Sequence, residues 1–316
     1  MDLAIVYIMN LITLGYFVLR LWKQYLQIAR RMIGIKLTDN PAIRRLVDGN
    51  KQMIGILYSL VKFRLVRLKK VGELFILGSS LYYLGRYDDA VECYDGILRR
   101  NWRNKYAWHN RGHALVALER YEDALLCWDK VLSLDANDKE ALYNRGIVLS
   151  YMDRYEDAVQ SYDRVLELDP DLKDGWYNRG VVLVEMGRYH DAVDSYDRAL
   201  ALAGDEECWF NKGAALVELE RHDEALECYH RAVCINEKLK EGWNGLGLVF
   251  AEMGDYEKAA EYYDRAIAVD ERYRDAWYNK GVALDILGLS EQAQYCYNRG
   301  LEIIKMIREE SLDNDL

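Results

Sequence analysis

The sequence predicts an all-α protein whose larger part is a solenoid of stacked helical hairpins. Of its 316 residues, 2 are proline and 51% are hydrophobic, which is too few helix breakers for a strand-and-turn protein or a disordered chain. A glycine recurs at intervals of 33 or 34 residues, a spacing typical of repeated helical hairpins. Each copy also contains two apolar stripes at helical spacing, separated by a break.

Charge divides the chain into two parts. Residues 1–70 contain 13 Lys and Arg against 3 Asp and Glu, whereas residues 71–316 contain 29 against 49. The net charge of the whole chain is −10, which argues against a general nucleic-acid-binding protein. The two parts are therefore expected to face different surroundings.

Residues 1–23 are predicted to form a transmembrane anchor helix. Leu3–Leu19 is uncharged, and its extension to Trp22 gives about 30 Å of helix, the apolar thickness of a bilayer. No basic residue precedes the segment and no Ala-x-Ala site follows it, so an uncleaved anchor is favoured over a signal peptide. Basic residues follow the segment, which predicts a single pass with the N-terminus outside and the repeats in the cytoplasm. The alternative is a buried or interfacial hydrophobic helix.

Residues 24–70 are predicted to form a basic helical neck. Asp39-Asn40-Pro41 is a helix-start pattern, and Gly49-Asn50 indicates a break before a second helix. That helix ends in a cluster of basic residues: Lys62, Arg64, Arg67, Lys69 and Lys70. Two interpretations stay open, contact with anionic lipid headgroups and an ordinary solvated face.

Residues 71–307 consist of seven copies of one unit. Four residues before the recurring glycine stands a large apolar residue, where the first helix (helix A) is predicted to begin. Alanine follows the glycine by twelve residues and an aromatic residue by sixteen, both on the second helix (helix B). The glycines are Gly78, Gly112, Gly146, Gly180, Gly213, Gly247 and Gly281. One hairpin cannot bury its apolar faces alone, so the copies are expected to stack.

Two other repeat positions have predicted structural roles. One holds a small residue and includes four cysteines, Cys93, Cys127, Cys228 and Cys296, which suits packing in the core. The other holds Asp95, Asp129, Asp163 and Asp197, which are expected to pair with nearby basic residues at the surface.

This repeat is similar to the tetratricopeptide repeat (TPR). The family spacing W-x2-[LRK]-G-x2-L…A-x3-Y is met across residues 71–307, in variants such as WYNRGVVL that resemble prokaryotic and archaeal arrays. The resemblance implies a right-handed superhelix of helix pairs in which the A helices line a concave, peptide-binding groove. The proline that closes the family's unit occurs once, at Pro170, and the loop at Gly204 is one residue short. Residues 308–316 are predicted to be an acidic tail.

Two neighbouring positions of helix A supply most candidate peptide-binding residues. The first is mostly aromatic, with Asn244 as the exception: Phe75, His109, Tyr143, Tyr177, Phe210 and Tyr278. The second is an asparagine ladder, interrupted by Ile76 and Gly245: Asn110, Asn144, Asn178, Asn211 and Asn279. An asparagine side chain offers the donor and the acceptor needed to hold a peptide backbone. The ladder resembles that of O-GlcNAc transferase; the alternative is that each asparagine bonds the neighbouring helix.

Glu185, Glu218 and Glu252 add carboxylates near the ends of the later A helices. The groove is therefore predicted to change from aromatic to acidic along the chain and to bind a peptide or helical segment of a partner protein, basic ones included. The alternative is that these carboxylates are only a solvated surface. The Lys, Asn and Arg clamp by which chaperone cofactors of the family bind acidic tails is absent.

The sequence contains none of the usual catalytic or nucleotide-binding motifs, such as GxxxxGK[ST] or GxSxG. His109 and His113 lie four residues apart, but no third metal ligand is evident. No enzyme activity, cofactor or metal is predicted. The predicted function is a membrane-anchored scaffold that binds a partner segment in its concave groove. The alternative is a soluble adaptor, or a regulatory subunit of an enzyme complex, whose N-terminal helices dock on a partner.

Overall fold

The computed structural model describes residues 71–314, which form fourteen α-helices and no strand. The predicted anchor (1–23) and neck (24–70) lie outside the described residues. Within the described part, no helix is both long and apolar enough to cross a membrane. The all-α hairpin solenoid predicted for residues 71–307 is confirmed.

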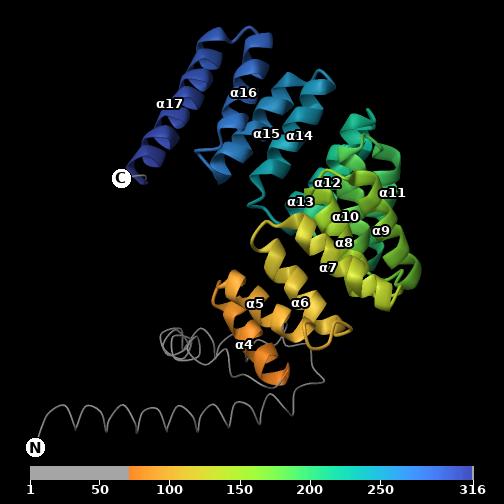
Figure 1. The fold of residues 1–316 in the computed structure, drawn as a ribbon. Coiled ribbons are helices and arrows are strands. Elements are labelled where there is room, and N and C mark those ends of the chain that lie inside the picture. The colour runs from red at the N-terminus through yellow and green to blue at the C-terminus, as the bar shows by residue number, and fades with distance from the viewer. Residues whose placement is uncertain (1–70, 315–316) are drawn as a thin grey trace, which may run out of the picture. The chain divides into compact units, whose positions relative to one another are not determined.

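The chain divides into two compact units, with the boundary after Ala136. The helices of the first unit are α4 (Val71–Tyr83), α5 (Tyr87–Leu98), α6 (Lys105–Val116) and α7 (Tyr121–Leu134). Those of the second unit are α8 (Lys139–Tyr151), α9 (Tyr155–Leu168), α10 (Lys173–Glu185), α11 (Tyr189–Leu202), α12 (Glu206–Glu218), α13 (His222–Ile235), α14 (Lys240–Glu252), α15 (Tyr256–Val269), α16 (Arg274–Ile286) and α17 (Ser290–Asn314). Even-numbered helices are A helices and odd-numbered helices are B helices (Figure 1).

Helix A begins earlier than predicted. In the second hairpin α6 starts at Lys105, three residues before Trp108. Asn104 supplies the physical reason, since its side chain accepts a hydrogen bond from the backbone N–H of Ala107 over 3.1 Å and caps the helix. The indole N–H of Trp108, one turn into the helix, donates to the backbone carbonyl of Trp102 in the preceding loop over 2.7 Å.

Each helix A ends at one residue with a left-handed backbone. This residue is glycine in four hairpins and Glu119, Asp153 or Glu220 in the other three, with φ between 55° and 82°. In the first hairpin the N–H of Arg86 donates to the carbonyl of Leu81 over 2.9 Å, which closes the helix end. The turn lies at the break that the sequence predicts.

Glycine and an aromatic ring hold the two helices of a hairpin close together. A Cβ built on Gly247 would lie 2.4 Å from Cε1 of Tyr263, and one on Gly146 would lie 2.7 Å from Cε1 of Tyr162. Real Cβ atoms do not approach so closely, so the ring of helix B occupies the space that a side chain on helix A would need. This explains why the repeated glycine and the aromatic residue occur together.

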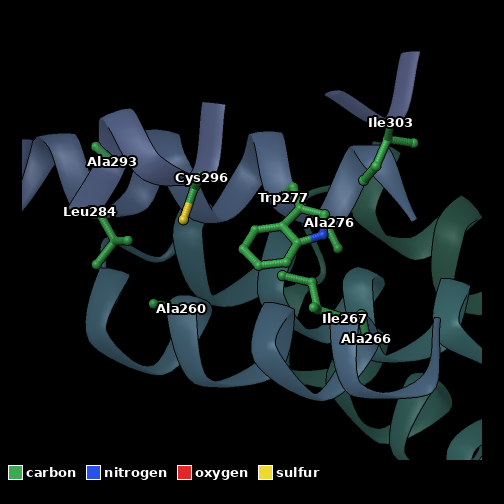
Figure 2. Packing of buried hydrophobic residues seen from close by; sticks show 9 residues of the cluster. All are labelled: Ala260, Ala266, Ile267, Ala276, Trp277, Leu284, Ala293, Cys296 and Ile303. Atoms are coloured by element: carbon green, nitrogen blue, oxygen red, sulfur yellow. The ribbon is translucent and has the colours of Figure 1, made fainter. Parts of the chain in front are cut away.

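Packing between hairpins uses the large apolar residue of helix A. In the last hairpins Trp277 and Ala276 of α16 belong to one buried cluster with Ile267 of α15 and Ile303 of α17. Figure 2 shows the Trp277 ring beside Ile267. The cysteine position is also confirmed as a core position, because Cys296 belongs to this cluster and its equivalents Cys93, Cys127 and Cys228 are buried.

The last helix closes the stack and extends beyond it. In earlier hairpins the position of Gln294 holds an aliphatic residue, and the position of Asn298 mostly holds an aspartate that faces the next hairpin. In α17 both residues are polar amides, and Gln294 Nε2 donates to Asn298 Oδ1 over 3.1 Å. The 25-residue helix continues through most of the predicted acidic tail. Glu310 there pairs with Arg272 over 2.7 Å, so this part of the tail contacts the loop between α15 and α16.

Candidate functional site

The A helices of the second unit form one layer. Each of α8, α10, α12 and α14 contacts the next A helix, whereas the B helices of this unit have no comparable contacts with one another. A stack whose A helices lie closer together than its B helices curves toward the A side. We call the solvent-exposed side of these A helices the inner face.

The asparagine ladder links successive A helices. Nδ2 of Asn178 donates to the hydroxyl of Tyr143 on the preceding A helix over 2.9 Å, and Nδ2 of Asn211 donates to the hydroxyl of Tyr177 over 2.8 Å. Each bond uses one N–H of the amide and leaves its Oδ1 as an acceptor. The two predicted rows of site residues therefore form pairs between neighbouring hairpins.

Asn279 explains the exception in the aromatic row. Its Nδ2 donates to Oδ1 of Asn244 on the preceding A helix over 3.1 Å. Asn244 is buried and takes the place of a tyrosine hydroxyl as acceptor. This substitution keeps the link between α14 and α16 without the aromatic ring.

One junction has neither partner of this pair. Phe210 on α12 has no hydroxyl to accept a hydrogen bond, and Gly245 on α14 has no side-chain amide to donate one. A Cβ on Gly245 would lie 2.8 Å from Cζ of Tyr229, so the packing leaves no room for an asparagine. Because donor and acceptor are absent together, no buried polar group is left without a partner.

The other two ladder residues bond their own helices. Nδ2 of Asn110 donates to the backbone carbonyl of Tyr106 over 2.7 Å, and Nδ2 of Asn144 donates to that of Glu140 over 2.8 Å. For Asn178, Asn211 and Asn279 the geometry favours the alternative in which the ladder joins neighbouring helices. Contact with a bound peptide stays a prediction for all five.

The aromatic residues are held against the B helices. The ring centroids of Tyr143, Tyr177 and Phe210 lie 6.2, 6.0 and 5.6 Å from the tyrosine of helix B in the same hairpin. Burial raises the pKa of Tyr177, and a hydrogen bond with the Glu207 carboxylate raises it further, so the hydroxyl stays protonated at neutral pH. The Tyr278 ring likewise lies 5.8 Å from that of Tyr297, but Tyr278 is 60% exposed.

The two members of the aromatic row in the first unit, Phe75 and His109, also pack inside their hairpins. Phe75 lies 6.0 Å from the Tyr94 ring in an edge-on contact, and His109 is buried. The neighbouring A-helix residue His113 lies edge-on to Trp128 at 5.7 Å. These side chains therefore contribute to the hairpin cores of this unit.

The predicted carboxylates Glu185, Glu218 and Glu252 are exposed at the ends of their helices. The charge of Glu218 raises the pKa of Tyr189 at the start of α11, and Nδ1 of His222 lies 3.5 Å from Oε2 of Glu252. Glu185 acts in the same way on Tyr155, so each of these carboxylates lies beside the first residue of the preceding B helix.

Basic residues on the A helices are engaged elsewhere. Arg179 of α10 pairs with Asp163 over 2.7 Å, and Lys212 of α12 pairs with Asp197 over 2.6 Å, both on the preceding B helix. Arg111 pairs with Asp95 over 2.7 Å in the first unit. The predicted ion pairing is confirmed for these three aspartates, and the carboxylates of the inner face keep their excess negative charge.

The end of the inner face is apolar, which the sequence analysis missed. Tyr278, Val282 and Ile286 follow one another at four-residue spacing along α16 and are 60%, 37% and 56% exposed. Leu248, at the position of α14 equivalent to Val282, is 40% exposed. A signal was present in the sequence, since Ile286 takes the position that holds glutamate in the three preceding hairpins.

Comparison with known families assigns almost all of the described chain. Tetratricopeptide repeat models match residues 140–172, 174–205, 206–239 and 241–273, and others match 77–125 and 275–305. A TPR repeat model matches 112–153. The chain belongs to the tetratricopeptide repeat family. The matching models describe repeats and indicate no catalytic family, and no curated protein matches the chain.

Solved TPR structures share this fold. The C-terminal part of a TPR repeat-containing protein from Cytophaga hutchinsonii has a TM-score of 0.63 at 16% identity, covering 72% of this chain and 95% of that one. A TPR protein from Parabacteroides merdae has a TM-score of 0.59 at 16% identity, covering 74% and 93%. MamA from Desulfovibrio magneticus has a TM-score of 0.52 at 24% identity, covering 54% and 96%. At these identities the likeness concerns the fold alone.

Proposed function

We propose that this TPR protein is a membrane-anchored, non-enzymatic scaffold that binds a segment of a partner protein on its inner face. The observation that carries the proposal is a row of aliphatic side chains at one position of successive A helices. The row consists of Ile147, Val181, Ala214, Leu248 and Val282. All five side chains are partly accessible, unlike the aliphatic residues that pack between the hairpins. Such a surface can bury apolar side chains of a ligand.

The ladder supports this role by fixing the spacing of the A helices. The Tyr143–Asn178 and Tyr177–Asn211 bonds join three consecutive A helices beside the aliphatic row. Helices tied in this way lose little conformational freedom when a ligand binds, which favours affinity. The free Oδ1 atoms can accept a hydrogen bond from the backbone of the bound segment.

Anchoring is the second part of the proposal. It rests on the uncharged segment Leu3–Leu19, and the basic residues after this segment favour a cytoplasmic location for the repeats. The full-length protein should fractionate with membranes and resist carbonate extraction. Recovery in the soluble fraction would contradict the anchor and leave the partner-binding proposal unaffected.

Site-specific photocrosslinking in the native cell tests partner binding. A photoreactive amino acid in place of Val181 lies on the inner face, and one in place of exposed Gln160 on α9 is the matched control. The expected result is a discrete adduct with another protein from Val181 and none from Gln160. The same adducts from both positions, or none from Val181, would argue against the inner face as the binding surface.

A further inference from the structure

We propose that the apolar patch at the end of the inner face binds a cationic amphipathic segment of the partner protein. The patch consists of Leu248 on α14 and Tyr278, Val282 and Ile286 on α16. This inference rests on the proposed function and adds the chemistry of the ligand.

The patch is accessible and continuous. Its three α16 residues lie at i, i+4 and i+8, so they follow one face of the helix over about 12 Å. Leu248 extends the patch onto α14, which contacts α16 and is tied to it by the Asn279–Asn244 bond. Two turns of exposed apolar side chains are enough to receive three apolar residues from one face of a ligand helix.

The surroundings of the patch are acidic. Glu241 and Glu252 lie at the two ends of α14, and Asp275 and Asp285 lie near the two ends of α16. Ser290 Oγ donates to Asp285 over 3.3 Å, and Asp275 pairs with its neighbour Arg274 over 2.7 Å. Glu252 has the histidine contact described above. Arg272, Arg274 and Arg308 line one pocket with Asp275, so the excess negative charge beside the patch comes from Glu252 and Asp285, near Ile286.

The lysines of these two helices do not offset this charge. Lys240 binds Asp270 over 2.6 Å, and Lys280 binds Asp264 on α15 over 2.6 Å. A ligand with lysine or arginine beside its apolar residues therefore finds complementary charge at the rim, while an acidic ligand meets like charge. This complementarity selects a cationic amphipathic segment over an acidic or purely polar one.

A designed peptide tests the inference with the full-length protein in mild detergent. The probe is a fluorescein-labelled helix-forming peptide of about 17 residues, with leucine at i, i+4 and i+8 and lysine and alanine elsewhere. A second peptide carries glutamate in place of every lysine. Fluorescence anisotropy should show binding of the lysine peptide, at least about tenfold tighter than the glutamate peptide at low salt, and weakening as salt rises.

Two pairs of variants locate the binding surface. Val282→Ser with Ile286→Ser removes the apolar patch, and its control is Tyr295→Ser with Leu301→Ser, which alters similarly exposed apolar residues of α17. The patch variant should bind the lysine peptide about tenfold more weakly, whereas the α17 variant should bind it normally. Glu252→Gln with Asp285→Asn should weaken binding about three- to tenfold at low salt. Its control with the same charge change is Glu257→Gln with Glu261→Gln on α15.

Three results would overturn the inference: no binding of the lysine peptide, equal binding of the glutamate peptide, or equal losses in the patch variants and their controls. Unchanged circular dichroism and thermal midpoints show that each variant is folded. The crosslinking experiment at Val181 tests partner binding by the inner face independently of the chemistry of the ligand. An adduct there with no lysine-peptide binding leaves the scaffold standing with a different ligand.

Discussion

The junction between α13 and α14 differs from the other junctions of the second unit. Where α11 meets α12, Tyr177 accepts from Asn211 on one side of the helix and Asp197 pairs with Lys212 on the other. At the α13–α14 junction the corresponding residues are Phe210 with Gly245 and His230 with Leu246. The hydrogen bond and the ion pair are therefore both absent, and in each case both partners have been replaced.

Close glycine and aromatic packing takes the place of these polar links. Gly245 lies against the preceding B helix, since a Cβ there would lie 2.8 Å from Cζ of Tyr229. On α15, Tyr262 stacks on Phe250 at 5.2 Å and lies 5.9 Å from His230 across the junction. The two junctions therefore join successive hairpins in different ways. Hairpins can be joined by paired polar groups or by backbone approach, and a half of either pair alone would be costly.

The largest expected effect comes from filling the space at this junction. Gly245→Ala puts a Cβ 2.8 Å from the buried Tyr229 ring, so the ring or the helix must move. The expected loss is about 1–3 kcal/mol of unfolding free energy in urea denaturation. Gly300→Ala on α17 is the control, because a Cβ there has no neighbour within 4 Å and should stabilise the helix by about 0.5–1 kcal/mol. Equal effects of the two substitutions would contradict the close packing.

The next effect concerns a polar junction. Arg179 donates to Asp163 over 2.7 Å and to the buried Ser195 hydroxyl over 2.6 Å. Arg179→Met should lower the unfolding free energy by about 1–2 kcal/mol, a value reduced by the partial exposure of Asp163. Leu246→Met at the equivalent position of α14 removes no polar link and should cost less than Arg179→Met. A larger loss from Leu246→Met would reverse the assigned difference between the junctions.

A smaller effect is expected for the ladder. Tyr177→Phe and Asn211→Ala should each cost about 0.5–1.5 kcal/mol, and the double variant should cost less than their sum because both remove one bond. Phe210→Tyr is the matched test at the other junction. Gly245 has no side-chain amide to donate to the new hydroxyl, so this substitution should add no ladder bond and should not raise the unfolding free energy. Additive costs for Tyr177→Phe and Asn211→Ala would show that the bond contributes nothing to stability.

The smallest effect depends on pH. Lys173, at the start of α10, pairs with Asp205, which also caps α12 by accepting from the N–H of Cys208 over 2.8 Å. Partial burial alone would raise the pKa of Asp205, but the bonds from Lys173 and Cys208 lower it below its ordinary value. A lowered folded-state pKa stabilises the protein above the ordinary pKa of Asp, and this contribution is lost as pH falls through the folded-state value.

Asp205→Asn tests this ion pair while keeping an N-cap residue. At pH 7 the variant should be less stable than the natural protein by about 0.5–1 kcal/mol, the discounted value of a partly exposed ion pair. The difference should shrink when urea titrations are repeated toward pH 3. At the α13–α14 junction the equivalent contact is a hydrogen bond from Asn236 Nδ2 to Glu206 over 3.3 Å, so Asn236→Ala should cost less. A difference independent of pH would show that Asp205 acts only as a cap.

The sequence by itself determined the seven hairpins, their register and the turn in each. These features depend on residues within one hairpin, such as the Gly247 and Tyr263 pair that sets the closeness of its two helices. The packing role of the cysteines was predictable for the same reason. The ion pairs of Asp163 and Asp197 join neighbouring hairpins, and they were predictable because acidic and basic residues recur at these positions in successive copies.

Only the tertiary structure decided which partners the ladder asparagines bond between hairpins. Asn178 and Asn279 occupy the same position in the repeat, yet the first bonds a tyrosine and the second an asparagine, because the acceptor comes from a different hairpin. Whether the side chains around Ile286 are exposed likewise depends on how the neighbouring helices pack against α16. Periodicity identifies equivalent residues, but the atoms they meet lie on helices about 34 residues away, and the packing of those helices determines which groups pair and which remain open to a partner.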